Sequence, residues 1–192
     1  MTAPMTPAEL STTLDAETLL PGAQFILSPN CDERPPGEII QLAVIHAISL
    51  PPGEFGGDAI ELLFTNRLNP ADHPYYAAIH GQRVSAHFLI RRNGALIQFV
   101  PCRKRAWHAG LSNWNGRDRC NDFSVGIELE GCDELPFEDA QYRILEHVLR
   151  VLKRSYPLSA VVGHAEIAPG RKTDPGLHFD WRRIAASLPG YR

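Results

Sequence analysis

Near-continuous apolar runs in two parts of the chain predict strands that are buried on both faces. Residues 39–50, IIQLAVIHAISL, are almost entirely apolar and contain several β-branched side chains. The shorter run SAVVGH covers residues 159–164. Runs of this kind are typical of strands inside a sheet whose two faces are both covered.

Helical spacing is found in three further segments. Residues 136–157 form the longest of them and end at Pro157, which cannot continue a helix. We also expect a short helix at residues 58–66, capped by Asp58, and a last helix that begins after Asp180 and ends before Pro189-Gly190. The longest helix has an apolar stripe at i, i+3, i+4 and i+7, formed by Leu145, Val148, Leu149 and Leu152.

A hairpin and the order of the elements define the expected fold class. Residues 85–101 contain two apolar runs joined at Asn93-Gly94, a strong hairpin signal. Strands and helices are interspersed without strict alternation, which favours an α/β fold: a single domain with a mixed central β-sheet flanked by helices. We expect residues 1–20 to be a loosely held lead-in and residues 21–192 to form the domain, with the site in a cleft at the sheet.

Composition narrows the range of partners. The chain has 192 residues and a formal net charge of −3, which argues against nonspecific binding to nucleic acid. No apolar run approaches the roughly 20 residues that span a bilayer, so no membrane partner is expected.

The N-terminal segment lacks the basic and apolar regions of a secretory signal, which favours the cytoplasm. The four cysteines form no CxxC pair and predict reduced thiols.

Residues 161–176, VVGHAEIAPGRKTDPG, bring candidate chemistry into one stiff loop. His164, Lys172 and Asp174 lie among prolines and glycines that restrict the backbone between them. Histidine and aspartate are good ligands for zinc, and a catalytic zinc usually has three protein ligands and one open position. The loop offers two ligands, so a third is expected elsewhere.

His46 is the best candidate for the third ligand. It lies near the end of the apolar strand, shortly before a Pro/Gly turn, where α/β sheets usually place ligand-binding side chains. The alternative is a core histidine whose two nitrogens are both hydrogen-bonded, and the spacing alone leaves both interpretations open.

Glu128 and Lys172 are candidates for the catalytic groups. The segment 123–131 alternates, with one face formed by Val125, Ile127 and Leu129 and the other by Gly126, Glu128 and Glu130. The glycine on the second face is expected to leave room for a ligand. A carboxylate beside a metal site can act as a general base, and an ammonium group two residues from a ligand can stabilise an oxyanion. The alternatives are a solvated strand face for Glu128 and an ordinary surface charge for Lys172.

Five long motifs extend this interpretation. They are VIHAISLPPGEFGG, RVSAHFLIRRNGALIQFVP, RAWHAGLS, RDRCNDFSVGIELEG and GHAEIAPGRKTDPG, in this order along the chain. Together they strongly resemble the zinc N-acetylmuramoyl-L-alanine amidases, a family related to phage-type lysozyme amidases and to the peptidoglycan recognition proteins. The resemblance extends from about Gly22 to about Trp181 and leaves out the first fifteen or so residues.

The resemblance implies a complete zinc site. His46, His164 and Asp174 are similar to the family's three ligands of a single Zn²⁺, with aspartate where the phage and recognition-protein relatives have cysteine. Glu128 resembles the catalytic carboxylate that transfers the proton, and Lys172 resembles the lysine that stabilises the transition state.

The resemblance also implies substrate-binding residues. Arg83 and Arg119 are similar to residues that hold carboxylates of the peptide or the sugar, and a guanidinium suits that task. Trp107 and His108 look like part of the wall of the substrate cleft. Ala47 departs from the family pattern, which has asparagine directly after the first ligand, so a hydrogen bond to the substrate peptide is lost there.

The implied activity is hydrolysis of the amide bond between (1,6-anhydro)-N-acetylmuramic acid and L-alanine, in the recycling of peptidoglycan. The expected partner is a small anhydromuropeptide, and the protein is expected to be a monomer. Two alternatives stay open: a non-catalytic module that binds muropeptides, and an amidase that acts on intact peptidoglycan. An unrelated zinc protease is disfavoured because the HExxH motif is absent.

Overall fold

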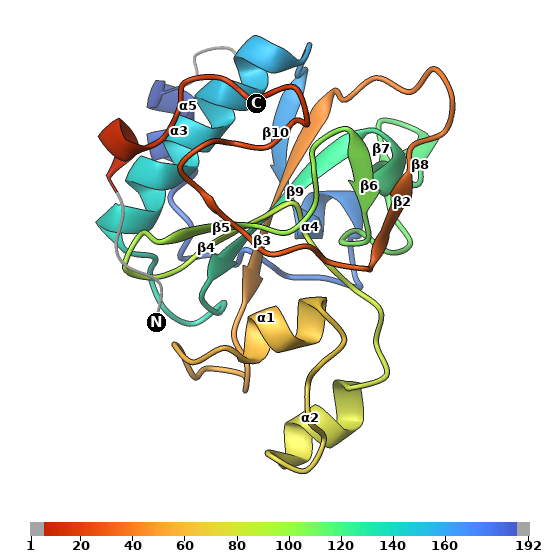
Figure 1. Ribbon diagram of the computed structural model, residues 1–192, viewed down its shortest axis with the longest axis vertical. Coiled ribbons are helices and arrows are strands. Elements are labelled where there is room, and N and C mark those ends of the chain that lie inside the picture. Colours follow the sequence, from red (N-terminus) through yellow and green to blue (C-terminus); the bar gives the residue numbers. More distant parts are fainter. Residues whose placement is uncertain (1–5, 188–192) are drawn as a thin grey trace.

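A six-stranded mixed sheet runs through the centre of the computed structural model, which describes residues 6–187 (Figure 1). The strand order is β1-β5-β4-β9-β3-β10. The strands are β1 (Gln24–Phe25), β2 (Cys31–Glu33), β3 (Leu42–Ile48), β4 (Phe88–Ile90), β5 (Leu96–Gln98), β6 (Lys104–Ala106), β7 (Asn113–Trp114), β8 (Arg117–Asp118), β9 (Ser124–Glu130) and β10 (Ala160–Gly163). The helices are α1 (Ala59–Phe64), α2 (Pro74–Ile79), α3 (Asp139–Ser155), α4 (His164–Ile167) and α5 (Trp181–Ser187), with short 3₁₀ turns at Pro7–Glu9 and Cys120–Asp122.

The long apolar run forms an inner strand of this sheet, as predicted. β3 lies between β9 and β10, and both neighbours run parallel to it. β4 also runs parallel to β9, whereas β4 and β5 pair antiparallel and form the predicted hairpin around Asn93-Gly94. The sheet is therefore mixed, and its four neighbouring parallel strands end at the same edge.

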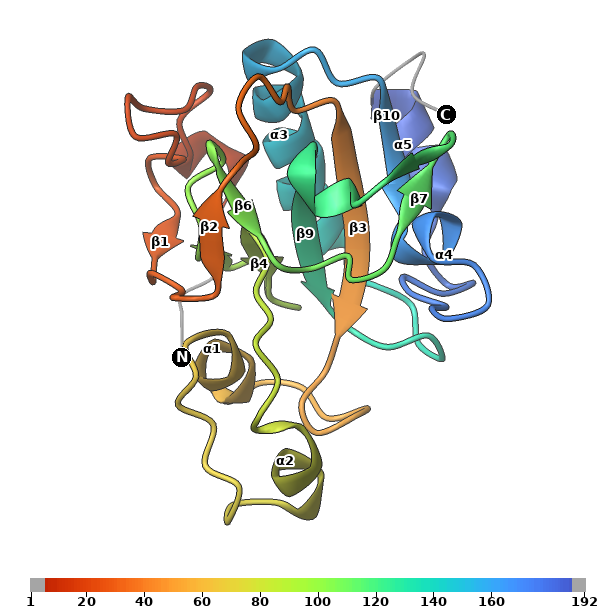
Figure 2. The ribbon, with the colours of Figure 1, turned by 90° about the vertical axis from the view of Figure 1, so that its right-hand side faces the viewer.

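The predicted long helix covers one face of the sheet. In Figure 2, α3 lies behind β9 and β3, and the chain between β6 and β7 passes in front of them. The apolar stripe of α3 is buried against the core-facing side chains of the strands, among them Ile45, Val125 and Ile127. Burial of an aliphatic side chain of this size contributes about 1.5–3 kcal/mol, so this layer carries much of the stability. The stripe consists of Leu145, Val148, Leu149 and Leu152.

The opposite face of the sheet is covered by loops and short strands. Leu42, Val44 and Val162 pack there against Ala109 and Phe123, which belong to the long connection between β6 and β9. Below the carboxyl ends of the parallel strands, α1 and α2 lie apart from the main layers (Figure 2). This arrangement leaves the carboxyl ends of β3, β9 and β10 between a helical segment and a cover of loops.

Two helix-capping predictions have different outcomes. Asp58 occupies the N-cap position of α1, but its side chain makes no capping hydrogen bond, so that part of the prediction is wrong. Asp180 does accept a hydrogen bond from the backbone N–H of Arg182 at the start of α5 (3.1 Å). The predicted end of this helix at Pro189-Gly190 lies outside the described residues.

The N-terminal segment from residue 6 contacts the domain. Leu10 and Leu20 are buried in the same cluster as α3. His147 and Arg154 of α3 also bind the backbone oxygens of Ser11 and Thr12. The boundary at residue 20 stays a prediction. Within residues 6–187, no helix combines the length and the apolar character that a membrane span requires.

Candidate metal centre

Strand register brings three candidate side chains to one edge of the sheet. In the pairing of β3 with β9, His46 lies directly opposite Glu128. In the pairing of β10 with β3, Gly163 lies opposite Ile45, so His164, the next residue, emerges beside His46. His164, which was predicted to end a strand, begins the four-residue helix α4. Three residues from distant parts of the chain therefore meet because adjacent parallel strands end together.

The loop between His164 and Asp174 folds back onto the start of α4. The backbone N–H of Ala165 donates to the carbonyl oxygen of Asp174 at 2.9 Å. Gly163 makes this return possible, since a Cβ at that position would lie only 2.8 Å from Cδ of Pro175. The glycine before the histidine is therefore required by the close approach of the Asp174-Pro175 segment.

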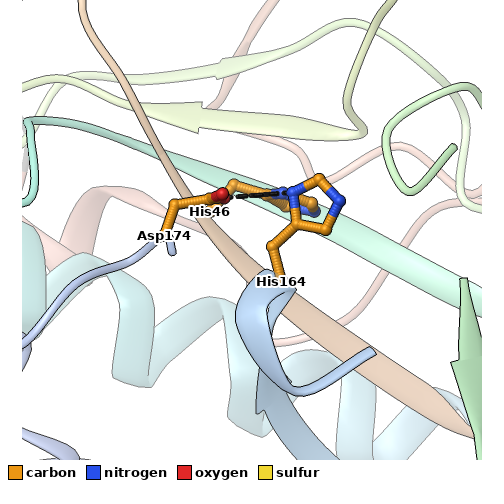
Figure 3. Close-up of side chains that lie close together, drawn as sticks. All are labelled: His46, His164 and Asp174. Atoms are coloured by element: carbon orange, nitrogen blue, oxygen red, sulfur yellow. Dashed lines mark hydrogen bonds and ion pairs between the residues drawn. The ribbon is translucent and has the colours of Figure 1, made fainter. Parts of the chain in front are cut away.

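His46, His164 and Asp174 form a tight triangle of ligand atoms (Figure 3). The two imidazole Nδ1 atoms are 3.0 Å apart, and Oδ2 of Asp174 lies 3.2 Å from Nδ1 of His46 and 3.1 Å from Nδ1 of His164. Atoms that ligate one tetrahedral zinc at its usual bond lengths lie about 3.3–3.4 Å from one another. These three side chains are thus arranged as a group that could hold one metal ion, as the sequence predicted.

The electrostatics of the triangle suit a cation. Burial lowers the pKa of His46 to about 4, so this imidazole is neutral at pH 7 and has a free lone pair. Burial alone would raise the pKa of Asp174, but the hydrogen bonds with His164 and His46 outweigh it and lower that pKa. Asp174 is therefore an ionised carboxylate, and a neutral imidazole with a carboxylate is the form in which these residues bind metals.

Glu128 lies in the same cleft and is buried rather than solvated. All seven residues of β9 are buried, so the alternative of a solvated strand face is wrong. Oε2 of Glu128 has no hydrogen-bond partner among the described residues. Burial and the negative charge of Asp174 raise the pKa of Glu128 well above its usual value, and the charge of Lys172 opposes this shift. An unpaired buried carboxyl group is costly, and such groups concentrate at functional sites.

The cleft that contains these groups has a volume of about 400 Å³. The three candidate ligands, Glu128 and Lys172 all line it, and so does Ala47. Lys172 is held by its backbone N–H, which donates to the carbonyl oxygen of Ala168 (3.1 Å). The structure therefore places the predicted ligands and the two predicted catalytic groups in one cavity.

The predicted substrate-binding residues are not gathered in the same way. Arg83 is exposed and donates to Oδ1 of Asn66 (3.3 Å). The side chain of Arg119 is 68% exposed and forms an ion pair with Asp122. Trp107 donates through Nε1 to Oδ1 of Asp32. None of the three is among the described residues that line the cleft. Their predicted substrate contacts stay predictions.

His108 lines the cleft, but its ring also contacts the side of His46 that faces away from the metal triangle. It is 8% exposed, and its Nδ1 lies 2.9 Å from Nε2 of His46. The sequence interpretation of Gly126 also changes: the space beside this glycine is filled by the ring of His108, whose Cγ would lie 2.4 Å from an added Cβ.

The sequence missed several residues of the cleft. Tyr75 and Ile79 lie on α2, a helix that was not predicted, and Cys132 follows β9. A signal for α2 is present, because His73 caps the helix and Pro74 occupies its first turn, a favoured position for proline. Cys132 gave no such signal, since a single cysteine after a strand has no characteristic spacing.

Comparison with known proteins identifies the class. The family model described as N-acetylmuramoyl-L-alanine amidase matches residues 36–177. The chain belongs to this family of amide hydrolases, which confirms the family and the enzyme class predicted from the sequence.

Individual relatives show which kind of amidase the chain is similar to. The 1,6-anhydro-N-acetylmuramyl-L-alanine amidase AmpD of Salmonella typhimurium is 57% identical over 166 residues, which cover 85% of this chain and 89% of the relative. A crystal structure of a selenomethionine derivative of AmpD aligns with a TM-score of 0.89 and 54% identity, over 91% of this chain and 98% of that chain.

More distant structures share the fold. The Escherichia coli amidase AmiD, in complex with the substrate anhydro-N-acetylmuramic acid-L-Ala-D-γ-Glu-L-Lys, aligns with a TM-score of 0.57 and 29% identity, over 94% of this chain and 66% of that chain. The peptidoglycan recognition protein LE aligns with a TM-score of 0.58 at 16% identity, over 88% of this chain and 95% of that chain. The predicted α/β fold and its relation to the recognition proteins are confirmed.

Proposed function

We propose that this protein is a zinc-dependent amidase that hydrolyses the amide bond between 1,6-anhydro-N-acetylmuramic acid and L-alanine of the stem peptide. The observation that carries the proposal is the triangle of His46, His164 and Asp174 beside the buried, unpaired carboxyl group of Glu128. The similarity to AmpD enzymes, which are named for this substrate, supports the choice of bond.

Zinc fits the donor set of the triangle. Two imidazole nitrogens and one carboxylate oxygen are typical ligands of a catalytic zinc, and the spacing of 3.0–3.2 Å between them is close to that of a tetrahedral site. When bound, zinc supplies a Lewis acid for the attacking water and the scissile carbonyl, and its charge favours the ionised form of Glu128. A site built on three protein residues also keeps one coordination position open.

Glu128 transfers the proton in the proposed mechanism. Its carboxylate accepts a proton from the water that attacks the lactyl carbonyl of the muramyl group. It then returns that proton to the nitrogen of L-alanine, so that the C–N bond breaks and a free carboxyl group and a free amine result. Burial suits this task, because a raised pKa lets one carboxyl group hold and release a proton near neutral pH.

Lys172 stabilises the charge that develops during the attack. Its ammonium group belongs to the same cleft, and its charge acts on both Glu128 and His46. A cation near the carbonyl oxygen stabilises a tetrahedral oxyanion more than it stabilises the neutral carbonyl, which accelerates the reaction.

Binding of the muropeptide also involves residues outside the cleft. Arg83 and Arg119 hold carboxylates of the peptide or the sugar, and Trp107 and His108 contribute to the wall beside the substrate. Ala47 provides no amide for the peptide backbone, so recognition there depends on other groups. We place the protein in the cytoplasm as a monomer that acts on soluble anhydromuropeptides in peptidoglycan recycling, with no nucleic-acid or membrane partner.

Two alternatives make different predictions. A non-catalytic muropeptide-binding module has no use for a complete ligand set beside an unpaired carboxyl group, so the site favours an enzyme. An amidase of intact peptidoglycan would share the metal chemistry and would differ only in its substrate.

The test combines metal removal with product analysis. We expect purified protein with one equivalent of zinc to convert anhydro-N-acetylmuramyl tripeptide to anhydro-N-acetylmuramic acid and free tripeptide, as resolved by HPLC. A chelator should abolish the activity, and added zinc should restore it. Binding of the substrate without cleavage in the zinc-loaded protein contradicts the proposal. Release of peptide from intact sacculi at a similar rate would instead support the second alternative.

A further inference from the structure

One loop contacts both imidazole ligands from behind. Residues 107–109 connect β6 to the covering loops. The side chain of His108 lies 2.9 Å from Nε2 of His46, and the carbonyl oxygen of Ala109 lies 3.1 Å from Nε2 of His164. Each imidazole therefore presents Nδ1 to the triangle and Nε2 to this loop.

The contact with Ala109 fixes the tautomer of His164. A carbonyl oxygen can only accept, and its 3.1 Å contact is shorter than the 3.4 Å between Nη2 of Arg171 and the same nitrogen, so we assign the proton to Nε2 of His164. The lone pair of Nδ1 is then free and points toward Asp174. Nη2 of Arg171 donates to the same carbonyl at 2.7 Å, which holds this oxygen in place. The carbonyl oxygen of Ala109 thus keeps the Nδ1 lone pair of His164 available for a metal.

The contact between His46 and His108 can run in two directions, and only one of them permits ligation. If Nε2 of His46 donates to Nδ1 of His108, then Nε2 of His108 donates to Oγ of Ser124 at 3.1 Å. In the opposite direction, the neutral His46 carries its proton on Nδ1, which faces Asp174, and it has no lone pair for a metal. His108 must therefore accept from His46 if His46 is a ligand.

His108 is held in the position from which it contacts His46. Its ring fills the space beside Gly126, whose lack of a Cβ is required there. Oδ1 of Asn121 accepts the backbone N–H groups of both His108 and Ala109, at 3.1 and 2.8 Å. Oγ of Ser85 accepts the backbone N–H of Trp107 at 3.1 Å. The position of the ring is thus fixed by the backbone and by close packing.

We propose that His108 is a positioning residue, which accepts the Nε2–H hydrogen bond of His46 and so sets the tautomer and orientation in which His46 binds zinc. The inference rests on the proposed function, because it requires His46 to be a ligand. Partners that orient a ligating histidine in this way typically contribute 10–100-fold to metal affinity. The role differs from that of a cleft wall, which acts on the substrate alone.

The first test measures zinc affinity by competition with a chromophoric chelator. His108→Phe keeps a ring of similar size and removes the acceptor, so its zinc affinity should fall about 10–100-fold. His108→Asn places an amide oxygen near the position of Nδ1 and should restore most of that loss. His147→Phe is the matched control, since His147 is also 8% exposed, bonds to the carbonyl oxygen of Ser11 and lies on α3, away from the cleft. Its zinc affinity should equal that of the parent.

An affinity of His108→Phe within about threefold of the parent, with the apo variant folded, overturns the inference. If His108→Phe does not fold, a measurement on the unaltered protein decides. Long-range ¹H–¹⁵N spectra of the zinc-loaded protein should show His108 as the neutral Nε2–H tautomer with an accepting Nδ1. A proton on Nδ1 of His108 contradicts the proposal. Failure of the parent to bind zinc at all would contradict the proposed function itself, so the two failures are distinguishable.

Discussion

The metal centre and the predicted substrate-binding residues differ in how the fold holds them. His46 and His164 are 1% and 3% exposed and emerge from neighbouring parallel strands. Arg119, by contrast, is 68% exposed at its side chain and, like Arg83, lies outside the regular strands and helices. Strand pairing therefore defines the positions of the ligands before any substrate is present, whereas Arg83 and Arg119 are exposed loop residues bonded to Asn66 and Asp122.

This difference separates the residues that take part in the reaction from those that bind the substrate. Groups that take part in bond breaking have to be placed within fractions of an ångström, and a sheet edge provides that precision. Groups that recognise a flexible peptide tolerate more movement and lie on loops in many enzymes. Substitutions at the sheet edge should therefore change kcat and metal affinity, and substitutions in the loops should change KM.

The largest effect is expected at Glu128. Glu128→Gln keeps the shape of the side chain and removes the proton acceptor, so kcat should fall about 10²–10⁴-fold while zinc remains bound. Steady-state kinetics and a zinc assay on the same sample measure both quantities. A variant with parental kcat would show that another group transfers the proton.

Glu130→Gln is the matched control for Glu128. Glu130 lies two residues further on the same face of β9, but its carboxylate pairs with Arg91 at 2.7 Å and accepts from the backbone N–H of Gly56. Loss of one partner of a buried ion pair destabilises a protein by up to about 3–5 kcal/mol, so the free energy of unfolding should decrease. The kcat of the folded variant should be unchanged, because this carboxylate is already paired.

Lys172→Ala should have the next largest effect. Removal of one group that stabilises an oxyanion costs about 10²–10³-fold in kcat in well-studied hydrolases. The zinc content should stay at one per chain, since Lys172 is not a ligand. Full activity of the alanine variant, measured with the same HPLC assay, would rule out the assigned role.

A pH-dependent effect on stability is expected from His87 beneath the site. Burial, helped by the charge of Arg34, lowers the pKa of His87 to about 3. The unfolded chain takes up this proton near pH 6.5, whereas the folded protein does not. The free energy of unfolding is therefore highest above pH 6.5 and falls as the pH decreases toward 3, by about 1.4 kcal/mol per pH unit for this one group.

Urea unfolding of the apo-protein between pH 7.5 and 4.5 measures this dependence. Nδ1 of His87 accepts from the backbone N–H of Gly126, and its Nε2 donates to the carbonyl oxygen of Lys104. His87→Gln keeps a polar group at this place and removes the proton uptake of the unfolded chain, so its stability should depend less steeply on pH. Equal slopes for parent and variant would contradict the assignment.

The smallest effect is expected at the exposed arginine Arg83. A solvent-exposed ion pair contributes about 1 kcal/mol or less, so Arg83→Ala should raise KM about fivefold or less. The kcat and the zinc affinity should not change. A loss of kcat instead of a rise in KM would place Arg83 with the catalytic groups and remove the contrast between the two regions.

The sequence predicted the central elements of the fold because their patterns are strong. The apolar run around His46, the alternation around Glu128 and the stripe of α3 each correspond to an observed element. The short strands β6, β7 and β8 span only two or three residues, too few for any periodicity to show. The helix α4 was missed for the same reason, since it has four residues.

The metal ligands could be predicted from the sequence, but the contact that orients His46 could not. His46, His164 and Asp174 lie next to strands and glycines, which mark the carboxyl edge of a sheet. The contact of His108 with His46 depends on how the loop after β6 packs against Gly126 of β9, and nothing in the order of residues indicates that packing. The room for a ligand that was expected beside Gly126 is filled by the side chain of His108, so that expectation was wrong.

Zinc K-edge X-ray absorption of the stoichiometrically loaded protein tests the ligand set most directly. Our account predicts two imidazole nitrogens and light oxygen ligands at about 2.0–2.1 Å, with no sulfur. Cys132 lies in the same cleft and is a free cysteine, so it is the residue that would supply a sulfur ligand. A sulfur scatterer at about 2.3 Å, or a spectrum without imidazole scattering, would contradict zinc ligation by His46, His164 and Asp174.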